Sequence, residues 1–502
     1  MTSRASLLVV ALFFYVFEEH SVSCQPGDSL YYKTARQCSN ETGAESVDDD
    51  LLDEILNVEC NWRLQSLGKV SDDPNALVRT FLSPAHRRSA AVLRAWMEDA
   101  GLRVWMDQLG NVRGRIEGSM PGTRAIVMGS HFDTVVDAGK WDGALGVVVA
   151  IQAVKALMSS GVPPLKPIEV VAFSDEEGVR FQSTFLGSRG ISGIFTEDLL
   201  ENRDQKGFTL SEVLKSAGLP GDMESIRRVA MKKDEVEAYV EFHIEQGPQL
   251  ERLGVPLGPV AAIAGQTRLQ VIISGDQGHA GTVPMLGRRD SVAAAAEMIV
   301  MIERRCGGGN HTLSQHIDPE EMLVCTVGEV RVWPGASNVI SGNTNITIDI
   351  RARRSEVRLS AVDDVMASIT EQCARRMMRC DIIRKHDAEA VESDPNLTQQ
   401  LVAAATTSMN ILRQRKESSK HGAGDEGGGA EASEEAEGPE SPVLVSGAGH
   451  DAMAMAHLTN VAMVFVRCHG GFSHSPLEHV EPEDVHAAAH ALYQFLKNAN
   501  RA

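Results

Sequence analysis

The sequence predicts an α/β protein in which a mixed sheet forms the main domain and a smaller β-α-β-β-α-β unit is inserted into it. Two observations lead to this prediction. Apolar strand-like and helix-like segments alternate over residues 124–174, which is typical of parallel strands joined by a crossover helix. A second set of strands and helices fills residues 258–391, and the first pattern resumes only after it. An inserted domain explains this interruption.

The main domain contains a strand-helix-strand unit. RAIVMGS (124–130) is rich in small and β-branched residues, as strands are. Residues 142–161 are largely apolar and end at Gly161, which indicates a buried helix. PIEVVAFS (167–174) and VEAYVEFHIEQG (236–247) are further strands. The strands at 124–130 and 167–174 are expected to be parallel, and ligands gather at the carboxyl ends of such strands.

The inserted unit follows the ferredoxin-like order β-α-β-β-α-β. Its clearest strand is NTNITIDIRA (343–352), where Ile346, Ile348 and Ile350 alternate with polar residues and predict one buried face. In chain order, the expected elements are 268–274, 288–305, 322–330, 343–352, 355–378 and 380–391.

The end of the chain is expected to complete the main domain with a helix at 396–409, a strand at 461–468 and a helix at 483–499. Residues 417–440 are acidic and rich in Gly and Ala. They cannot bury apolar surface, so we expect a disordered insertion there. The sequence therefore predicts a catalytic domain in two parts and a lid between them, at 51–257, 392–502 and 258–391 respectively.

The first 24 residues have the pattern of a secretory leader. Arg4 precedes an apolar run from Ala5 to Phe17, and small residues follow. The run is too short to span a bilayer comfortably. We therefore expect a signal peptide at 1–24, no stable membrane insertion, and a location in the secretory pathway, with the endoplasmic reticulum lumen as the favoured compartment.

The eight cysteines show no zinc-finger spacing. Cys24, Cys38 and Cys60 lie in the N-terminal part and could pair in an oxidising lumen. Cys373 and Cys380 lie seven residues apart at the end of an expected helix, and they are too far apart to bridge each other if that helix continues.

The composition is that of a soluble globular protein, with 43% hydrophobic and 23% charged residues in 502. The formal net charge of −20 argues against nucleic acid as a partner, because the phosphate backbone would be repelled.

Polar side chains lie at the ends of three expected strands. His131 follows the first, Glu176 and Glu177 follow the second, and His243 ends the third. A dinuclear hydrolytic site needs His and carboxylate ligands, one bridging carboxylate, and a free carboxylate that takes a proton from water. Asp142 is placed to be the bridge, so these residues together predict a metal site.

Two further residues fit the same site. Asp133 lies two residues after His131 and is expected to fix the imidazole tautomer, and His474 follows two glycines near the C-terminus. Each candidate also has an ordinary explanation. Asp142 could cap the helix that follows it, the paired glutamates could be solvated, His243 could be a core histidine, and His474 could be a surface residue. Their shared position at strand ends and loops favours the metal site.

Several motifs resemble those of the dinuclear metallo-amidohydrolases, which include aminoacylases, carboxypeptidases, N-carbamoyl amino acid amidohydrolases and ureide hydrolases. They include GSHFDTVVDAGKWDGALGV, AFSDEEGVRFQSTFLGSRG, HIEQGPQLE, GHAGTVPM and FSHSPLEHV. The resemblance runs from about Leu51 to Leu496 and is closest to the plant-type allantoate branch. It implies a metallo-exopeptidase-like catalytic domain with an inserted ferredoxin-like lid.

The resemblance also implies a role for each candidate ligand. His131 and His243 would hold one metal, Glu177 and His474 the other, and Asp142 would bridge them, while Glu176 would be the general base. The implied cofactor is a pair of divalent ions, with manganese favoured. Ligand type alone also allows zinc or cobalt, because no thiolate is present.

The residues that the resemblance implies for the substrate lie mostly in the lid: Gln266, Arg268, His279, Asn338, Arg351, and the backbone at Gly447 and Ala448. Arg351 would hold a substrate carboxylate through its planar fork, and His279 would stabilise the oxyanion. The family usually forms homodimers through the lid, and the matching His then reaches into the partner's site.

The activity that the resemblance implies is hydrolysis of allantoate, a small ureide, to ureidoglycine, carbon dioxide and ammonia. Ureidoglycolate and N-carbamoyl-β-alanine are alternative substrates, because substrate choice rests on few residues. An inactive binding paralogue is the non-enzymatic alternative, and the complete ligand set with Glu176 argues against it.

Overall fold

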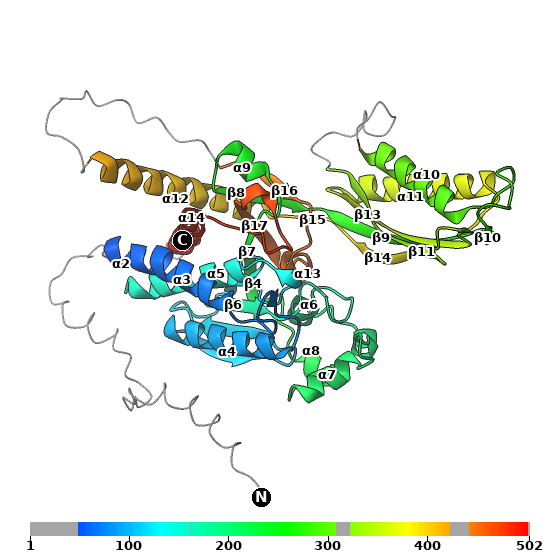
Figure 1. Ribbon diagram of the computed structural model, residues 1–502. Helices are drawn as coiled ribbons and strands as arrows, with labels where there is room; N and C mark the ends of the chain where they lie inside the picture. Colours follow the sequence, from blue (N-terminus) through cyan, green and yellow to red (C-terminus); the bar gives the residue numbers. More distant parts are fainter. Residues whose placement is uncertain (1–48, 162, 308–321, 422–440, 500–502) are drawn as a thin grey trace, which may run out of the picture. The chain divides into compact units, whose positions relative to one another are not determined.

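The computed structural model describes residues 49–161, 163–307, 322–421 and 441–499 (Figure 1). The predicted leader and most of the predicted acidic insertion lie outside these residues. The predicted start of the insertion is wrong by a few residues, because helix α12 (Pro395–His421) continues through residues 417–421. The sequence up to His421 is rich in helix formers, and Gly422 is the first poor one after them.

Among the described residues, the larger sheet has nine strands in the order β15-β8-β17-β7-β4-β6-β3-β2, with β16 paired to β8. The strands are β2 (Arg103–Met106), β3 (Val112–Ile116), β4 (Ala125–His131), β6 (Ile168–Phe173), β7 (Val236–Ile244), β8 (Leu257–Ile263), β15 (Val391–Glu392), β16 (Leu444–Ser446) and β17 (Asn460–Val466). The central strands β17, β7, β4 and β6 are parallel to one another.

The centre of this sheet is buried because helices cover it. Helix α5 (Ala144–Ser159) contacts β4, β6 and β7, and its own outer side is covered by α14 and α3. Both faces of β4 and β6 are buried, because every residue of the two strands is buried. This burial explains why the sequences of β4, β6 and α5 are nearly continuous apolar runs. The predicted parallel pairing of the strands at 124–130 and 167–174 is confirmed.

The remaining elements of the main domain are mostly helical: α2 (Asp49–Asp53), the π-helical segment η1 (Glu54–Glu59), α3 (Cys60–Leu67), α4 (Pro84–Asp99), α6 (Leu186–Ser192), α7 (Leu210–Ser216), α8 (Met223–Arg227), α9 (Gln249–Leu253), α13 (Asp451–Met455), α14 (Pro482–Ala499) and the short 3-10 turns η2 (Glu197–Glu201) and η4 (His469–Gly471). A two-stranded ribbon joins β1 (Leu77–Val78) to β5 (Val136–Ala138).

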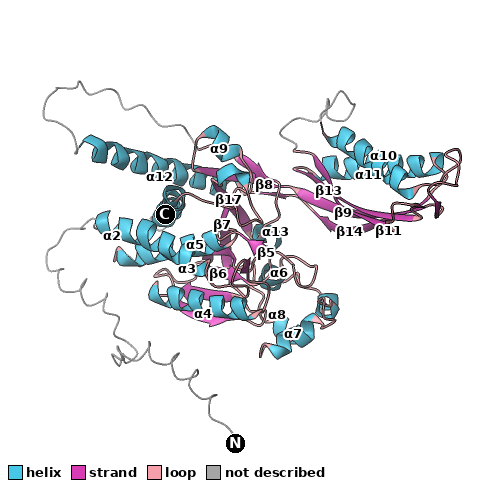
Figure 2. Cartoon of the chain, viewed as in Figure 1, coloured by secondary structure: helices cyan, strands magenta, loops and turns pink. Residues whose placement is uncertain are grey.

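The inserted unit, called the lid below, contains a four-stranded antiparallel sheet in the order β11-β13-β9-β14. Its elements are β9 (Gly265–Ser274), α10 (Ser291–Cys306), β11 (Val324–Trp333), β13 (Asn343–Ala352), α11 (Ser355–Arg375) and β14 (Arg379–Ala388), with the short pair β10 (Gly278–His279) and β12 (Val339–Ile340). Figure 2 shows α10 and α11 side by side on one face of this sheet. The predicted ferredoxin-like order and the α/β fold class are confirmed.

One face of the lid sheet packs against these helices. Ile346, Ile348 and Ile350 are buried there with residues of α10 and α11 such as Met298 and Val365, as the alternation in the sequence predicts. In the described residues, no helix combines the length and the apolar character that a membrane span needs.

Cys373 and Cys380 form a disulfide, because the helix that would have kept them apart does not continue to Cys380. Helix α11 ends at Arg375, and Met377 adopts a positive φ of 52°, so the chain turns back and brings the two Cα atoms to 6.2 Å. Cys306 and Cys325 form a second lid disulfide. Cys60 is buried and forms no disulfide with a described residue, and the other two cysteines considered for pairing, Cys24 and Cys38, lie outside the described residues.

Candidate metal centre

The parallel strands of the main sheet bring the predicted ligands to one edge. His131 is the last residue of β4, Glu176 and Glu177 follow β6, and His243 is the penultimate residue of β7. These three strands are neighbours with the same direction, so their carboxyl ends lie together. Asp142 comes from the loop before α5.

Gly143 allows Asp142 and His131 to approach each other. A Cβ atom at residue 143 would lie 2.4 Å from atoms of the His131 ring, and Gly143 has a φ of +63°. No other residue type fits without moving the imidazole. The small residue in the sequence is therefore a requirement of the site.

The tautomers of two histidines follow from their backbone contacts. Nδ1 of His131 donates to the Asp133 carbonyl at 3.1 Å, and Nδ1 of His243 donates to the Ile244 carbonyl at 2.9 Å. In the neutral rings, Nε2 then carries a lone pair. The two Nε2 atoms are 3.5 Å apart, so two lone pairs converge on one point, which is favourable when a proton or a metal cation lies between them.

The carboxylate of Asp142 lies between two groups of side chains. Its Oδ1 is 3.1 Å from Nε2 of His243 and 3.7 Å from Nε2 of His131, and its Oδ2 is 3.2 Å from Nε2 of His474. Oδ1 is buried and makes no hydrogen bond to the described residues. An orphaned carboxylate oxygen facing two imidazole nitrogens fits a divalent cation.

Three groups of side chains offer ligand atoms within 4.8 Å of one another: His131 with Asp142 and His243, Asp142 with Glu177 and His474, and His131 with Glu176 and Glu177. The first two groups share Asp142, and their membership is the one that the resemblance implies for two metals. Nitrogen and oxygen donors without sulfur suit zinc, manganese or cobalt. The binding of metal by these residues stays a prediction.

Asp133 organises the acid pair more than it orients the imidazole. Its carboxylate accepts the backbone N–H of Glu176 at 3.0 Å and that of Glu177 at 3.2 Å. Its Oδ1 is 3.5 Å from Nδ1 of His131, whereas its own carbonyl oxygen is closer to that nitrogen. The sequence alone could not distinguish these contacts, because both atoms belong to the same residue.

The protonation of the site reflects crowded carboxylates. Burial, which outweighs the attraction of His131, raises the pKa of the Glu176 carboxyl well above its ordinary value. Burial and the nearby Asp142 carboxylate raise the pKa of Glu177 to about 7. The hydrogen bond with Asp142 raises the pKa of His474 to about 9. Negative charge in so dry a place has to be balanced by protons or by bound cations.

The sequence analysis missed three residues that hold this cluster. Gln246 donates to Oδ2 of Asp142 at 3.1 Å, and the Ser473 hydroxyl donates to the same oxygen at 3.0 Å. Glu478 is buried and accepts the backbone N–H groups of Trp141 and Asp142 at 2.8 and 3.0 Å. Each lies within one to four residues of a predicted ligand and inside a quoted motif, and that position was the available signal.

Some of the predicted substrate residues lie at the end of the lid sheet that joins the main domain. Arg351 donates from Nη1 to the Gly447 carbonyl at 2.7 Å, so Gly447 and its neighbour Ala448 lie beside the lid strand β13. Arg351 pairs in register with Gln266, which is the second residue of β9 and is buried. Arg268 follows on the same face and contacts Asp349 at 3.2 Å.

The other predicted substrate residues lie at the opposite end of the lid sheet. His279 follows β9 and is exposed, and Asn338 lies beside it, because the Ala280 N–H donates to the Asn338 carbonyl at 2.9 Å. From Gln266 to Ser274 the strand advances eight residues (274 − 266), or about 27 Å. One chain therefore cannot bring His279 and Arg351 to the same small ligand.

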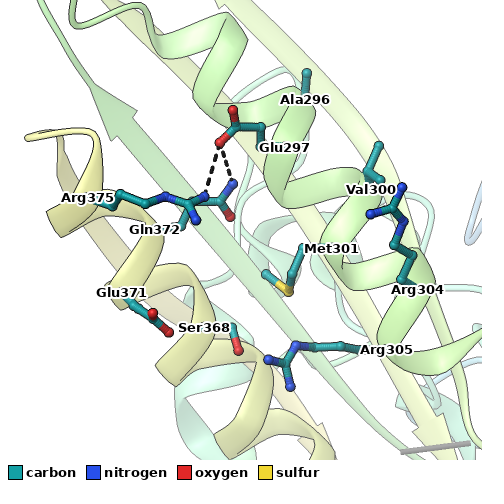
Figure 3. A pocket seen from close by; sticks show the side chains of 10 residues that line it. All are labelled: Ala296, Glu297, Val300, Met301, Arg304, Arg305, Ser368, Glu371, Gln372 and Arg375. Atoms are coloured by element: carbon teal, nitrogen blue, oxygen red, sulfur yellow. Dashed lines mark hydrogen bonds and ion pairs between the residues drawn. The ribbon is translucent and has the colours of Figure 1, made fainter. Parts of the chain in front are cut away.

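A separate hollow of about 550 Å³ lies between α10 and α11 on the helical face of the lid (Figure 3). Glu297 contacts Gln372 and Arg375 there. None of the predicted site residues lines this hollow.

A buried His-Asp-Glu cluster at the carboxyl ends of parallel strands is the arrangement of a metal-dependent hydrolase. The chain belongs to the peptidase family M20/M25/M40, whose model matches residues 127–428 and 429–498. It is 47% identical to the allantoate deiminase of Arabidopsis thaliana (90% of this chain, 84% of that protein) and 48% identical to allantoate deiminase 2 of Glycine max (91% and 92%).

A solved structure shares the fold over most of its length. The crystal structure of AtUAH in complex with glyoxylate matches with a TM-score of 0.73 and 29% identity, covering 89% of this chain and 98% of that one. An amidase of the hydantoinase/carbamoylase family from Burkholderia multivorans matches with the same TM-score and 27% identity, over 89% and 98% of the two chains.

Proposed function

We propose that this enzyme hydrolyses allantoate to ureidoglycine, carbon dioxide and ammonia. One observation supports metal-dependent hydrolysis above all others. Two groups of potential metal ligands share Asp142, and Glu176 lies beside them. The substrate is supported by the two relatives named allantoate deiminase, which are 47–48% identical over about nine tenths of the chain.

The proposed cofactor is a pair of divalent ions, with manganese favoured. His131 and His243 would hold one ion, Glu177 and His474 the other, and Asp142 would bind both. When bound, such ions polarise the scissile carbonyl and make water more acidic. The convergent imidazole nitrogens and the orphaned Asp142 oxygen support this arrangement.

Glu176 is proposed to move the proton. Its Oε2 is 3.9 Å from Nε2 of His131, and it is buried beside the cluster. As the base, it takes a proton from the water that attacks the ureido carbonyl carbon. It then gives this proton to the terminal nitrogen, so the C–N bond breaks and ammonia leaves. The carbamate that remains loses carbon dioxide and yields ureidoglycine.

We further propose a homodimer in which His279 acts in the partner's site. The support is the length of β9, which separates His279 and Asn338 from Arg351 by about 27 Å along the lid. A two-fold dimer resolves this separation, since each chain gives its His279 and receives another. There the imidazole would stabilise the oxyanion, and Arg351 would hold the substrate carboxylate.

A secretory location is proposed as well. The two lid disulfides support it, because disulfides persist in oxidising compartments and are rare in the cytosol. The predicted leader itself lies outside the described residues.

The test is an assay of ammonia release by purified protein loaded with manganese. Allantoate should be turned over much faster than ureidoglycolate or N-carbamoyl-β-alanine. Comparable or faster turnover of either rival would overturn the substrate assignment. A loaded protein that binds allantoate but turns over none of the three would instead be the inactive paralogue.

A further inference from the structure

Phe185 has a backbone conformation that a bulky residue rarely adopts. Its φ is +66° and its ψ is 25°, which is the left-handed region, and it directly precedes helix α6. In this region Cβ is crowded against the following carbonyl oxygen, so few residues other than Gly, Asn and Asp enter it. Strain of this kind persists only where the surrounding structure holds it, and it is concentrated at functional sites. The contacts of Phe185 therefore have to compensate the strain.

The backbone of Phe185 holds the carbonyl group of Glu176. The Phe185 N–H donates to the Glu176 carbonyl oxygen at 3.1 Å, and the Leu186 N–H donates to the Asp175 carbonyl oxygen at 2.9 Å. These two hydrogen bonds close the loop of residues 177–184, which leaves the main sheet after β6. Because α6 fixes the chain that follows, the φ of Phe185 sets the direction of its N–H.

Glu176 is thus held on both sides of its Cα atom. Its N–H donates to the Asp133 carboxylate at 3.0 Å, and its carbonyl oxygen accepts from Phe185. The side chain that leaves this fixed Cα places Oε2 3.9 Å from Nε2 of His131. A general base has to lie within hydrogen-bond reach of the water that it deprotonates, so a fixed backbone at Glu176 favours catalysis.

The ring of Phe185 fixes the other end of this arrangement. It is buried, and a Cβ atom at Gly449 would lie 2.8 Å from its Cζ, so the ring packs directly against the Gly449 backbone. Gly449 precedes His450, whose ring lies 4.5 Å from that of His243 between centroids. With the ring fixed here and the N–H bonded to Glu176, the strained φ cannot relax without breaking one of the two contacts.

We propose that Phe185 is a positioning residue for the general base. Its buried ring holds the strained backbone, and the strained backbone holds Glu176 in place. A displacement of about 1 Å at a catalytic group lowers the rate about 10²-fold, so this hold has a measurable effect on turnover. The inference rests on the proposed role of Glu176 and adds the residue that fixes its position.

The first variant is Phe185→Leu, which keeps an apolar side chain but loses the reach of the ring to Gly449. We expect kcat to fall about 10- to 100-fold. KM should stay within about threefold and the metal content should not change, because only the position of Glu176 is disturbed. Phe185→Gly removes the ring and frees the backbone, so its loss should be at least as large. The substrate is the ureide that wild-type protein turns over fastest.

Phe181→Leu is the matched control for general packing. Phe181 lies in the same loop, is buried as Phe185 is, and packs edge-on against Phe81 with centroids 6.2 Å apart. Its φ is negative, and none of the hydrogen bonds among the described residues joins it to Glu176. Both Phe-to-Leu variants should lower the temperature of unfolding by similar amounts, but only Phe185→Leu should lower kcat.

A double variant tests whether Phe185 acts through Glu176. Glu176→Gln removes the base, so its position should then no longer matter. Adding Phe185→Leu to Glu176→Gln should lower the remaining turnover by less than about threefold, measured with enzyme in excess over substrate. A residue that only supports the fold would lower turnover by the same factor in both backgrounds.

Each outcome has one meaning. A fall in kcat that is confined to Phe185 variants and disappears in the Glu176→Gln background supports the proposal. An unchanged kcat, a loss of metal, a large change in KM, an equal loss in Phe181→Leu, or an equal loss in the Glu176→Gln background would each overturn it. Wild-type turnover by Glu176→Gln would instead refute the base in the proposed function.

Discussion

The catalytic sheet and the lid sheet are both covered by helices, yet they distribute their functional side chains differently. Neighbouring strands β4, β6 and β7 are parallel, so their carboxyl ends share one edge and gather His131, Glu176 and His243. The lid strands are antiparallel, so successive strands end at opposite edges. Its functional residues are therefore divided between the two ends of β9.

This difference determines what one chain can complete. The main domain assembles the whole candidate metal cluster from its own residues. The lid places Arg351 beside Gly447 of the same chain but holds His279 at its far end. Parallel strands bring the side chains of one site together at one edge of the sheet. Antiparallel strands place functional side chains at both ends of the lid sheet, so the lid is suited to contributing to two sites.

The largest effect is expected at the catalytic edge. Glu176→Gln keeps the size of the side chain and removes its proton-accepting power. Turnover should fall about 10³-fold, since general acid–base catalysis contributes on this scale, while both metals stay bound. Asp142→Ala should lose metal as well, because Asp142 belongs to both ligand groups. Metal analysis and steady-state kinetics measure the two effects.

Glu177→Gln is the matched variant for this test, since Glu177 is adjacent and was assigned to metal. If Glu176→Gln lost its metal and Glu177→Gln stayed fully loaded, the two roles would have to be exchanged.

The second effect tests the division of the lid. His279→Ala should reduce turnover about 10²- to 10³-fold, the usual cost of removing an oxyanion donor. Mixed with Glu176→Ala and allowed to exchange subunits, it should form hybrid dimers with one intact site. Random exchange makes about half of the dimers hybrid, so activity should recover to about a quarter of wild type.

Labelled subunits provide the control for this experiment. If exchange is complete and activity stays at the level of the single variants, His279 does not act across an interface, and the lid would have to complete its site within one chain.

The smallest effect concerns stability, and it contrasts the two regions again. Both disulfides among the described residues lie in the lid, whereas Cys60 and Cys468 of the main domain are free and buried. The bond between Cys306 and Cys325 spans 19 residues. Replacing both cysteines by Ser should lower the free energy of unfolding by about 3 kcal/mol, because the unfolded chain regains loop entropy.

Denaturant unfolding with and without a reducing agent measures this contribution. A variant that lacks all four lid cysteines is the control and should not respond to the reductant. Wild-type protein whose stability is unchanged by full reduction would contradict the stabilising role of the disulfides.

The sequence by itself determined the order of the elements and the chemistry of the site. The spacing of apolar residues and the turn residues predicted the bounds of β4, α5 and β6 to within a few residues. The alternation of Ile346, Ile348 and Ile350 predicted the buried face of the lid sheet. These signals are local, because strand and helix periodicities are written in consecutive residues. The family motifs supplied the ligand set, because metal chemistry restricts the residue types that can serve.

Only the tertiary structure decided how distant residues meet. Glu478 binds the backbone at Asp142 across 336 residues of chain, and Asp133 uses its carboxylate on the Glu176–Glu177 backbone. Nothing local in either stretch specifies the partner. The Cys373–Cys380 bond depended on where α11 ends, and a positive φ at Met377, which the sequence pattern did not signal, fixed that end.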